Sequence, residues 1–317
     1  MNKLFCSIAI YLLAGVASIY AIDLTDSTQY QAYEDDISSL AEEMLTNRDK
    51  QVRLATSQQL EEKLKEALEK DPELAYPFKN IKGVSILNAE NKDFRIFTWQ
   101  VYIDPDTYEY AGLIQTKDGS IHRLDDKSKD MRSPEFFRLK PDNWYGALYY
   151  GMHPFKHENK TMYLLFGYDA YSMLNKRKIL EVLYFDHEGK PKFGKKVIQV
   201  KDGYGRTVDI HRYLIEYSAT VSVGLKYSGE EKMVIFDHLI QTAPVPGQGP
   251  ANVPDGSYCG LEWKDNKWTY VDKVYEDIPG NTLIEAETPQ ETIKRHNKTK
   301  DKKEKRDILG RRQKEKK

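Results

Sequence analysis

Asp and His lie next to each other, or two residues apart, at three places in this chain. Their carboxylate and imidazole groups can act together in catalysis. Phe-Asp-His occurs at residues 185–187 and 236–238, and Asp-Xaa-His occurs at residues 209–211. A carboxylate beside an imidazole suits a divalent metal site or general acid–base catalysis. Adjacent strand residues point to opposite faces, so only the pair in 209–211 would share a face. The first residues to test for catalysis are Asp186, His187, His211 and Asp237.

A structural interpretation of these pairs competes with the catalytic one. At the end of a hairpin, Asp accepts turn hydrogen bonds and His faces water. No Cys or His pair has the close spacing of zinc ligands, so we expect no metal ion and no cofactor. The carboxylates of Asp169, Glu181 and Glu216 could pair for glycosidic chemistry, but isolated acids in strands usually lie on the solvated face.

Established catalytic motifs are absent from the sequence. There is no Gly-Xaa-Ser-Xaa-Gly elbow, phosphate-binding loop, glycine-rich dinucleotide turn or His-Glu-Xaa-Xaa-His motif. We therefore expect a non-enzymatic protein that binds or braces a partner. The alternative is a hydrolase that acts on a glycan or a peptide at a cleft of Asp, His and Glu residues.

Aromatic side chains are the other candidates for function, because the chain has 22 tyrosines and 4 tryptophans. Tyr and Trp that face outward from a sheet can stack on sugars or dominate a protein interface. The alternative, that most of them fill the core, stays open at this point. The residues that we expect to form a binding surface are Trp99, Trp144, Tyr145, Tyr149 and Tyr168.

The N-terminal residues 1–21 have the layout of a secretory signal peptide. A short positive start precedes an uncharged apolar run, and small residues lead to Ala21, after which we expect cleavage. A membrane anchor is the alternative, because the run is about the minimum length for a span. We expect an exported protein that is periplasmic or associated with the cell surface.

The periodicity of apolar residues predicts a mainly β, α+β fold. Residues 22–77 form a helical segment, in which apolar residues recur at helical spacing from 36 to 70 and Asn47 to Asp49 separate two helices. Residues 78–276 alternate with period two between turn clusters, which predicts a large antiparallel β-meander. The meander could be a curved sheet, an open barrel or a sandwich. It is organised around the aromatic hairpins of residues 143–200.

Several segments resemble an uncharacterised family of secreted Bacteroidota proteins. The resemblance rests on Tyr76-Pro77-Phe78, on the strand Phe94–Trp99, on Trp144–Tyr150, and on Phe185-Asp186 with Gly189–Gly194. It covers about residues 30–275. The resemblance implies export and one continuous domain, and it brings no activity and no site residues.

The C-terminal residues 277–317 form a basic tail that we expect to be disordered. From Lys294 onward it holds thirteen Lys or Arg against four Asp or Glu, with few large apolar residues. Its charge could attract an anionic surface, an envelope glycan or another envelope protein. Nucleic acid is the poorest partner, because the chain is expected to be exported and the tail has no aromatic residue to stack on bases.

Overall fold

The structure, a computed structural model, describes residues 24–79, 81–243 and 249–274. The predicted signal peptide of residues 1–21 and the predicted disordered tail of residues 277–317 lie outside the described residues. The chain begins with two helices, α1 (Leu24–Thr46) and α2 (Lys50–Glu69). Asp49 caps α2, since its carboxylate accepts a hydrogen bond from Gln51 N at 2.8 Å. The expected break between two helices is thereby confirmed. None of the described helices is long and apolar enough to cross a membrane.

Strands make up most of the remaining chain, which confirms the mainly β fold class. The strands are β1 (Ser85–Asn88), β2 (Phe94–Asp104), β3 (Thr107–Thr116), β4 (Ile121–Asp125), β5 (Leu148–His157), β6 (Lys160–Asp169), β7 (Asn175–Phe185), β8 (Pro191–Phe193), β9 (Ile198–Lys201), β10 (Thr207–Ile210), β11 (Arg212–Ser218), β12 (Leu225–Ser228), β13 (Met233–Gln241), β14 (Asn252–Lys264) and β15 (Lys267–Val271). Three short 3-10 turns, η1 (Ser128–Asp130), η2 (Pro134–Phe136) and η3 (Pro141–Asn143), lie between β4 and β5.

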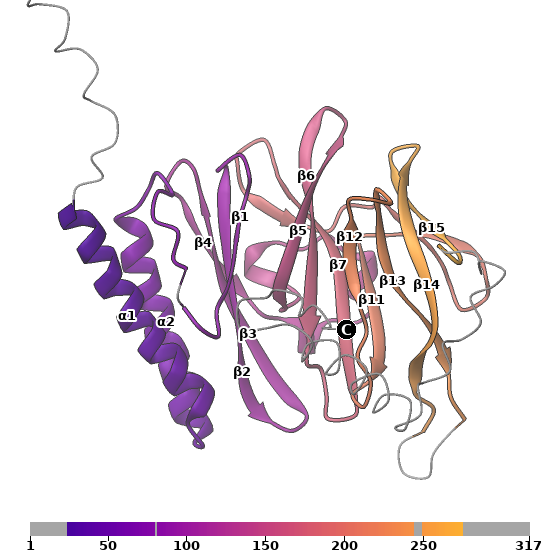
Figure 1. The fold of residues 1–317 in the computed structure, drawn as a ribbon, viewed down its shortest axis with the longest axis horizontal. Coiled ribbons are helices and arrows are strands. Elements are labelled where there is room, and N and C mark those ends of the chain that lie inside the picture. The colour runs from indigo at the N-terminus through magenta and orange to yellow at the C-terminus, as the bar shows by residue number, and fades with distance from the viewer. Residues whose placement is uncertain (1–23, 80, 244–248, 275–317) are drawn as a thin grey trace, which may run out of the picture. The chain divides into compact units, whose positions relative to one another are not determined.

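The described strands form three open, mainly antiparallel sheets (Figure 1). The first sheet has the order β1-β2-β3-β4, the second β11-β7-β6-β5 with β8 beside β7, and the third β10-β9-β15-β14-β13-β12. The chain leaves the second sheet after β8 and returns to it at β11. Among the described strands, β9 and β15 form the one parallel pair, and the other pairs are antiparallel.

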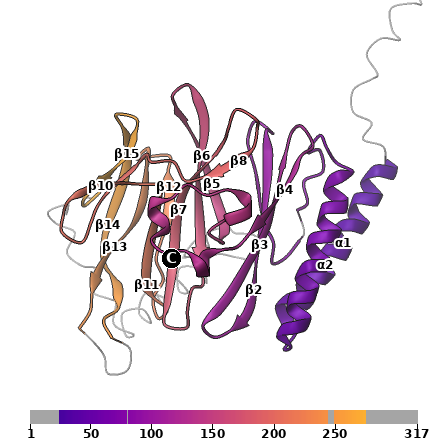
Figure 2. The same ribbon diagram turned by 180° about the vertical axis from the view of Figure 1, so that it is seen from behind.

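The helices and sheets form four layers with an apolar core between each neighbouring pair. Even-numbered residues of β2 such as Phe94 pack toward the second sheet, and odd-numbered ones such as Trp99 pack toward the helices. In β6, Leu165 faces the first sheet and Leu164 faces the third. These central strands are apolar on both faces because each lies inside the stack. Figures 1 and 2 show the helix pair beside β1–β4, with β12–β15 at the other end.

Two strand boundaries differ from what the sequence pattern predicts, which is a strand from Trp144 and a loop over the proline-rich residues 242–256. Strand β5 begins at Leu148 and not at residue 144, because Gly146 has a φ of +76° and the Asp126 carboxylate occupies the space of a Cβ there. The proline-rich segment expected as a loop over residues 242–256 instead starts β14 at Asn252. Pro254 of β14 lies opposite Leu239 of β13, just past the register shift between Asp237 and Leu239. At such an irregularity a strand can include a proline, which has no N–H to donate.

Candidate functional site

Asp186 and His187 form the turn that connects β7 to β8. The Asp186 carboxylate accepts hydrogen bonds from Glu188 N and Lys190 N, both at 3.0 Å, and pairs with Lys192 Nζ at 3.1 Å. Desolvation would raise the pKa of Asp186, but these hydrogen bonds and the lysine charge lower it to about 2. The His187 side chain is 85% exposed beside Glu188. Asp186 and His187 therefore belong to a hairpin turn, which the Asp186 contacts stabilise.

His211 and Asp237, the other two expected catalytic residues, have separate structural contacts. His211 Nδ1 lies 3.2 Å from Gly194 O, and the Asp237 carboxylate accepts a hydrogen bond from Gly224 N at 2.5 Å. Within the described residues, no hydrogen bond or ion pair joins any two of the four expected catalytic side chains. Across all the described residues, no group of three or more His, Cys, Asp or Glu side chains could hold a metal ion.

A different imidazole–carboxylate pair, which sequence spacing did not indicate, is formed by His238 and Asp255. His238 Nδ1 lies 2.8 Å from Asp255 Oδ2, because β13 and β14 are neighbouring strands. The Ser257 hydroxyl donates to Asp255 Oδ1 at 2.7 Å. In a nucleophilic triad the serine would donate to the imidazole, whereas here it donates to the carboxylate. The Ser257 hydrogen bonds and His238 lower the pKa of Asp255 to about 2.

Four of the five aromatic residues expected at a binding surface are buried, so the expectation is wrong for these four. Trp99, Trp144 and Tyr149 are 0% exposed and Tyr145 is 1% exposed. The helix pair covers Trp99, and the packing of the first sheet against the second covers Trp144, Tyr145 and Tyr149. Their polar atoms are satisfied inside: Trp144 Nε1, for example, donates to Tyr149 Oη at 2.7 Å. Tyr168 alone among the five is partly exposed.

Two of the three strand acids, Glu181 and Asp169, are not on a solvated face, whereas Glu216 is partly exposed and pairs with Arg177. Glu181 is fully buried and accepts a hydrogen bond from Arg212 Nε at 2.9 Å and another from Tyr149 Oη. Asp169 is buried and accepts from the hydroxyls of Tyr110 and Tyr145, both at 3.1 Å. Burial raises the pKa of Asp169 above its ordinary value. Each of these carboxylates is fully engaged in holding strands together.

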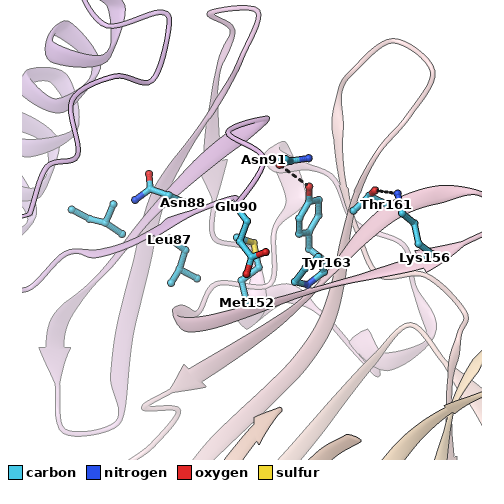
Figure 3. Close-up of a pocket in the computed structure, with 10 residues that line it drawn as sticks. Leu87, Asn88, Glu90, Asn91, Met152, Lys156, Thr161 and Tyr163 are labelled. Carbon is cyan, nitrogen blue, oxygen red and sulfur yellow. Dashed lines mark hydrogen bonds between the residues drawn. The ribbon is translucent and has the colours of Figure 1, made fainter. Parts of the chain in front are cut away.

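An open pocket of about 530 Å³ lies where the edge strand β1 of the first sheet meets the edge strand β5 of the second (Figure 3). Its apolar walls come from both edges, and its polar groups come from the β1–β2 turn and from β5 and β6. The lining residues are Ile86, Leu87, Asn88, Glu90, Asn91, Met152, Pro154, Lys156, Thr161 and Tyr163.

The polar side chains of the pocket are spread around its apolar floor. Glu90 projects between Leu87 and Tyr163 with its carboxylate toward Met152 (Figure 3). The Tyr163 hydroxyl donates to Asn91 Oδ1 at 3.3 Å, and Lys156 Nζ donates to Thr161 Oγ1 at 2.6 Å. Burial raises the pKa of Tyr163, so its hydroxyl remains a donor at neutral pH. In the described part of the chain, Glu90 has no ion-pair partner.

The pocket thus offers amides, hydroxyls, one carboxylate and one ammonium above aliphatic side chains and a tyrosine ring. Such a mixture hydrogen-bonds a polar organic molecule while covering its apolar faces. No sequence pattern marks these residues, because Asn88 to Asn91 and Met152 to Tyr163 are brought together by sheet packing. Protein-family models, curated proteins and solved structures contain no match to this chain. The resemblance to a secreted family therefore stays a prediction.

Proposed function

We propose that this protein is exported and binds, without catalysis, a saccharide segment of the cell envelope in the pocket between β1 and β5. The observation that carries the proposal is the lining of the pocket. Asn88, Glu90 and Asn91 present planar amide and carboxylate groups, which pair with vicinal hydroxyls, and the half-buried Leu87 and Met152 offer apolar surface for a sugar face. The open edge suits an internal segment of a longer chain.

The carboxylate content of the pocket supports binding over hydrolysis. Glycoside hydrolases use two carboxyl groups on opposite sides of the scissile bond, about 5–10 Å apart. Among the residues that line this pocket, Glu90 is the one carboxylate. The buried acids Asp169 and Glu181 are occupied by tyrosine and arginine partners elsewhere.

Binding of oligosaccharides to wild-type protein and to the double variant Asn88→Ala, Glu90→Gln tests this proposal. A glycan array of neutral and acidic oligosaccharides identifies a ligand, and calorimetry then measures its affinity. We expect the double variant to bind about 10- to 100-fold more weakly, because two hydrogen-bonding groups are lost. The exposed residue Glu231 lies on the turn between β12 and β13 and provides the control Glu231→Gln, which should bind as wild type.

Two results would count against the proposal. Equal affinity of the wild type and the double variant would place the binding site elsewhere. Release of shorter saccharides during incubation would favour the hydrolase alternative. In that case the variants Asp186→Ala, His187→Ala, His211→Ala and Asp237→Ala should be assayed for loss of cleavage.

A further inference from the structure

Phe136 and Phe137 are neighbouring apolar side chains that the fold leaves in contact with water. Phe136 ends the 3-10 turn η2, and Phe137 follows it directly. Each ring is 56% exposed, whereas the other phenylalanines of the described residues are buried or half-buried. Two adjacent exposed rings form an apolar surface that is unfavourable in water and that a partner would cover.

The backbone that carries these rings is fixed from beneath by the start of β11. The guanidinium of Arg212, which is 0% exposed, donates to Phe137 O at 3.0 Å and to Pro134 O. The backbone N–H of His211, which directly precedes β11, donates to Glu135 O at 2.7 Å. Carbonyl oxygens on both sides of the turn are thus anchored, so the exposure of the two rings is built into the fold.

Cations surround the ring pair. Arg138 directly follows it, and Lys196 comes from the connection between β8 and β9. Desolvation lowers the pKa of His211, and the charges of Arg138 and Lys196 lower it further, so both cations lie near the turn to which His211 is bonded. Both are exposed. Residues 132–140 as a whole hold three exposed cations and one carboxylate, which are Arg132, Arg138, Lys140 and Glu135.

The directions of the two rings favour a lipid surface over a pocket in another protein. A 3-10 helix has about 3.0 residues per turn, so successive side chains around it point about 120° apart. One narrow pocket could not enclose two rings that diverge in this way, whereas fluid acyl chains can surround both. Arg and Lys fit the same partner, because their apolar stems stay beside the rings while their charged ends reach the phosphate groups.

We propose that Phe136, Phe137, Arg138 and Lys196 form a surface that docks on an anionic lipid membrane, with both rings among the acyl chains and both cations at the phosphates. This membrane surface lies beside β11, at one edge of the second sheet. The saccharide pocket lies beside β5, at the opposite edge of that sheet. The two surfaces therefore do not share residues, and the inference does not rest on the proposed function.

Tryptophan fluorescence of the full-length variant Phe137→Trp tests insertion of the ring. The probe is a vesicle of phosphatidylcholine and phosphatidylglycerol whose acyl chains carry bromine, which quenches tryptophan on contact. We expect the added fluorescence, relative to the wild type, to shift to shorter wavelength and to be quenched. The control Tyr204→Trp, at an 87% exposed position in the β9–β10 turn, should remain unquenched. Because the signal is local, membrane binding through residues 1–21 or 277–317 does not imitate it.

Charge variants in the Phe137→Trp background test the role of the cations. Arg138→Gln with Lys196→Gln should raise the vesicle concentration needed for half-maximal quenching by about tenfold or more. The matched control, Lys201→Gln with Lys226→Gln, removes the same charge at two exposed positions of β9 and β12 and should leave that concentration unchanged. Vesicles of phosphatidylcholine alone should quench far less. All these positions are exposed, so the variants should melt like the wild type.

Three results would overturn the proposal. Absence of quenching at position 137, or equal quenching at position 204, would show that the ring pair does not insert. Equal vesicle requirements of the charge variant and its control would show that the cations do not contact the lipid. Binding to soluble polyglutamate that the charge variant loses, without quenching by vesicles, would assign the surface to an acidic protein. None of these results depends on whether the saccharide pocket binds its ligand.

Discussion

Asp186 directly follows β7 and stabilises the turn that leads into β8. Its carboxylate accepts two backbone N–H groups and pairs with Lys192, so the residue type that suits catalysis here serves local structure. The same holds for Glu181, which could have been one half of a catalytic acid pair and instead joins β7 to β11 through Arg212. At the residue scale, the contacts of a side chain decide between these roles.

We expect Asp186→Asn to destabilise the protein in a pH-dependent way. The folded pKa of Asp186 is about 2, below its ordinary value of 3.8. Its charge therefore contributes stability above about pH 4, and this contribution is lost as the pH falls toward 2. The difference in free energy of unfolding between wild type and variant should shrink from about pH 5 to about pH 2. Urea unfolding across this range measures it, and a constant difference would contradict the structural role.

Arg212→Met should be strongly destabilising, by about 3–5 kcal/mol, because it leaves Glu181 buried without its partner. Both side chains of this pair are 0% exposed. The control is Arg206→Met, which breaks the ion pair to Asp202 at a side chain that is 72% exposed and should cost less than about 1 kcal/mol. Chemical unfolding of the two variants provides the comparison. Similar losses of unfolding free energy in both variants would show that burial of the Arg212–Glu181 pair does not increase its contribution to stability.

At the scale of elements, the helix pair is bound to the first sheet by an apolar layer and by a buried polar contact. Leu60, Leu64 and Leu68 of α2 pack against Phe97 and Trp99 of β2. Just beyond α2, the Asp71 carboxylate pairs with Arg95 of β2 at 2.9 Å, with both side chains almost fully buried. The helices therefore complete the core of the first sheet.

Leu64→Ala tests how much the helix layer contributes to stability. Leu64 is 0% exposed, and removing its side chain should lower the free energy of unfolding by about 2–5 kcal/mol. Leu45 of α1 is 52% exposed, so the control Leu45→Ala should cost less than about 1 kcal/mol. Denaturant unfolding monitored by circular dichroism measures both. A separate early transition in Leu64→Ala that involves only helical signal would show that the helices unfold independently of the sheets.

At the scale of the whole molecule, export is the prediction that governs which ligands the protein can meet. The charged start, the apolar run and Ala21 predict that the chain isolated from its native cell begins near Ile22. Mass spectrometry of the N-terminal peptide tests this directly. A native chain that retains Met1 would contradict cleavage, and it would also remove the argument for an envelope saccharide as the ligand.

The sequence alone determined the kinds of elements and their order, and tertiary structure decided the sites. Helical spacing and period-two alternation are local consequences of burying one side of an element, so the break at Asn47 to Asp49 and most strands could be predicted. Whether the second face of a sheet is also covered depends on which helices and sheets pack against it, and therefore Trp99 and Trp144 could not be distinguished from surface aromatics. The pocket of Glu90 and Tyr163 and the membrane surface of Phe137 and Lys196 join segments distant in sequence. Their proximity follows from sheet order and from packing between layers, which no local pattern encodes.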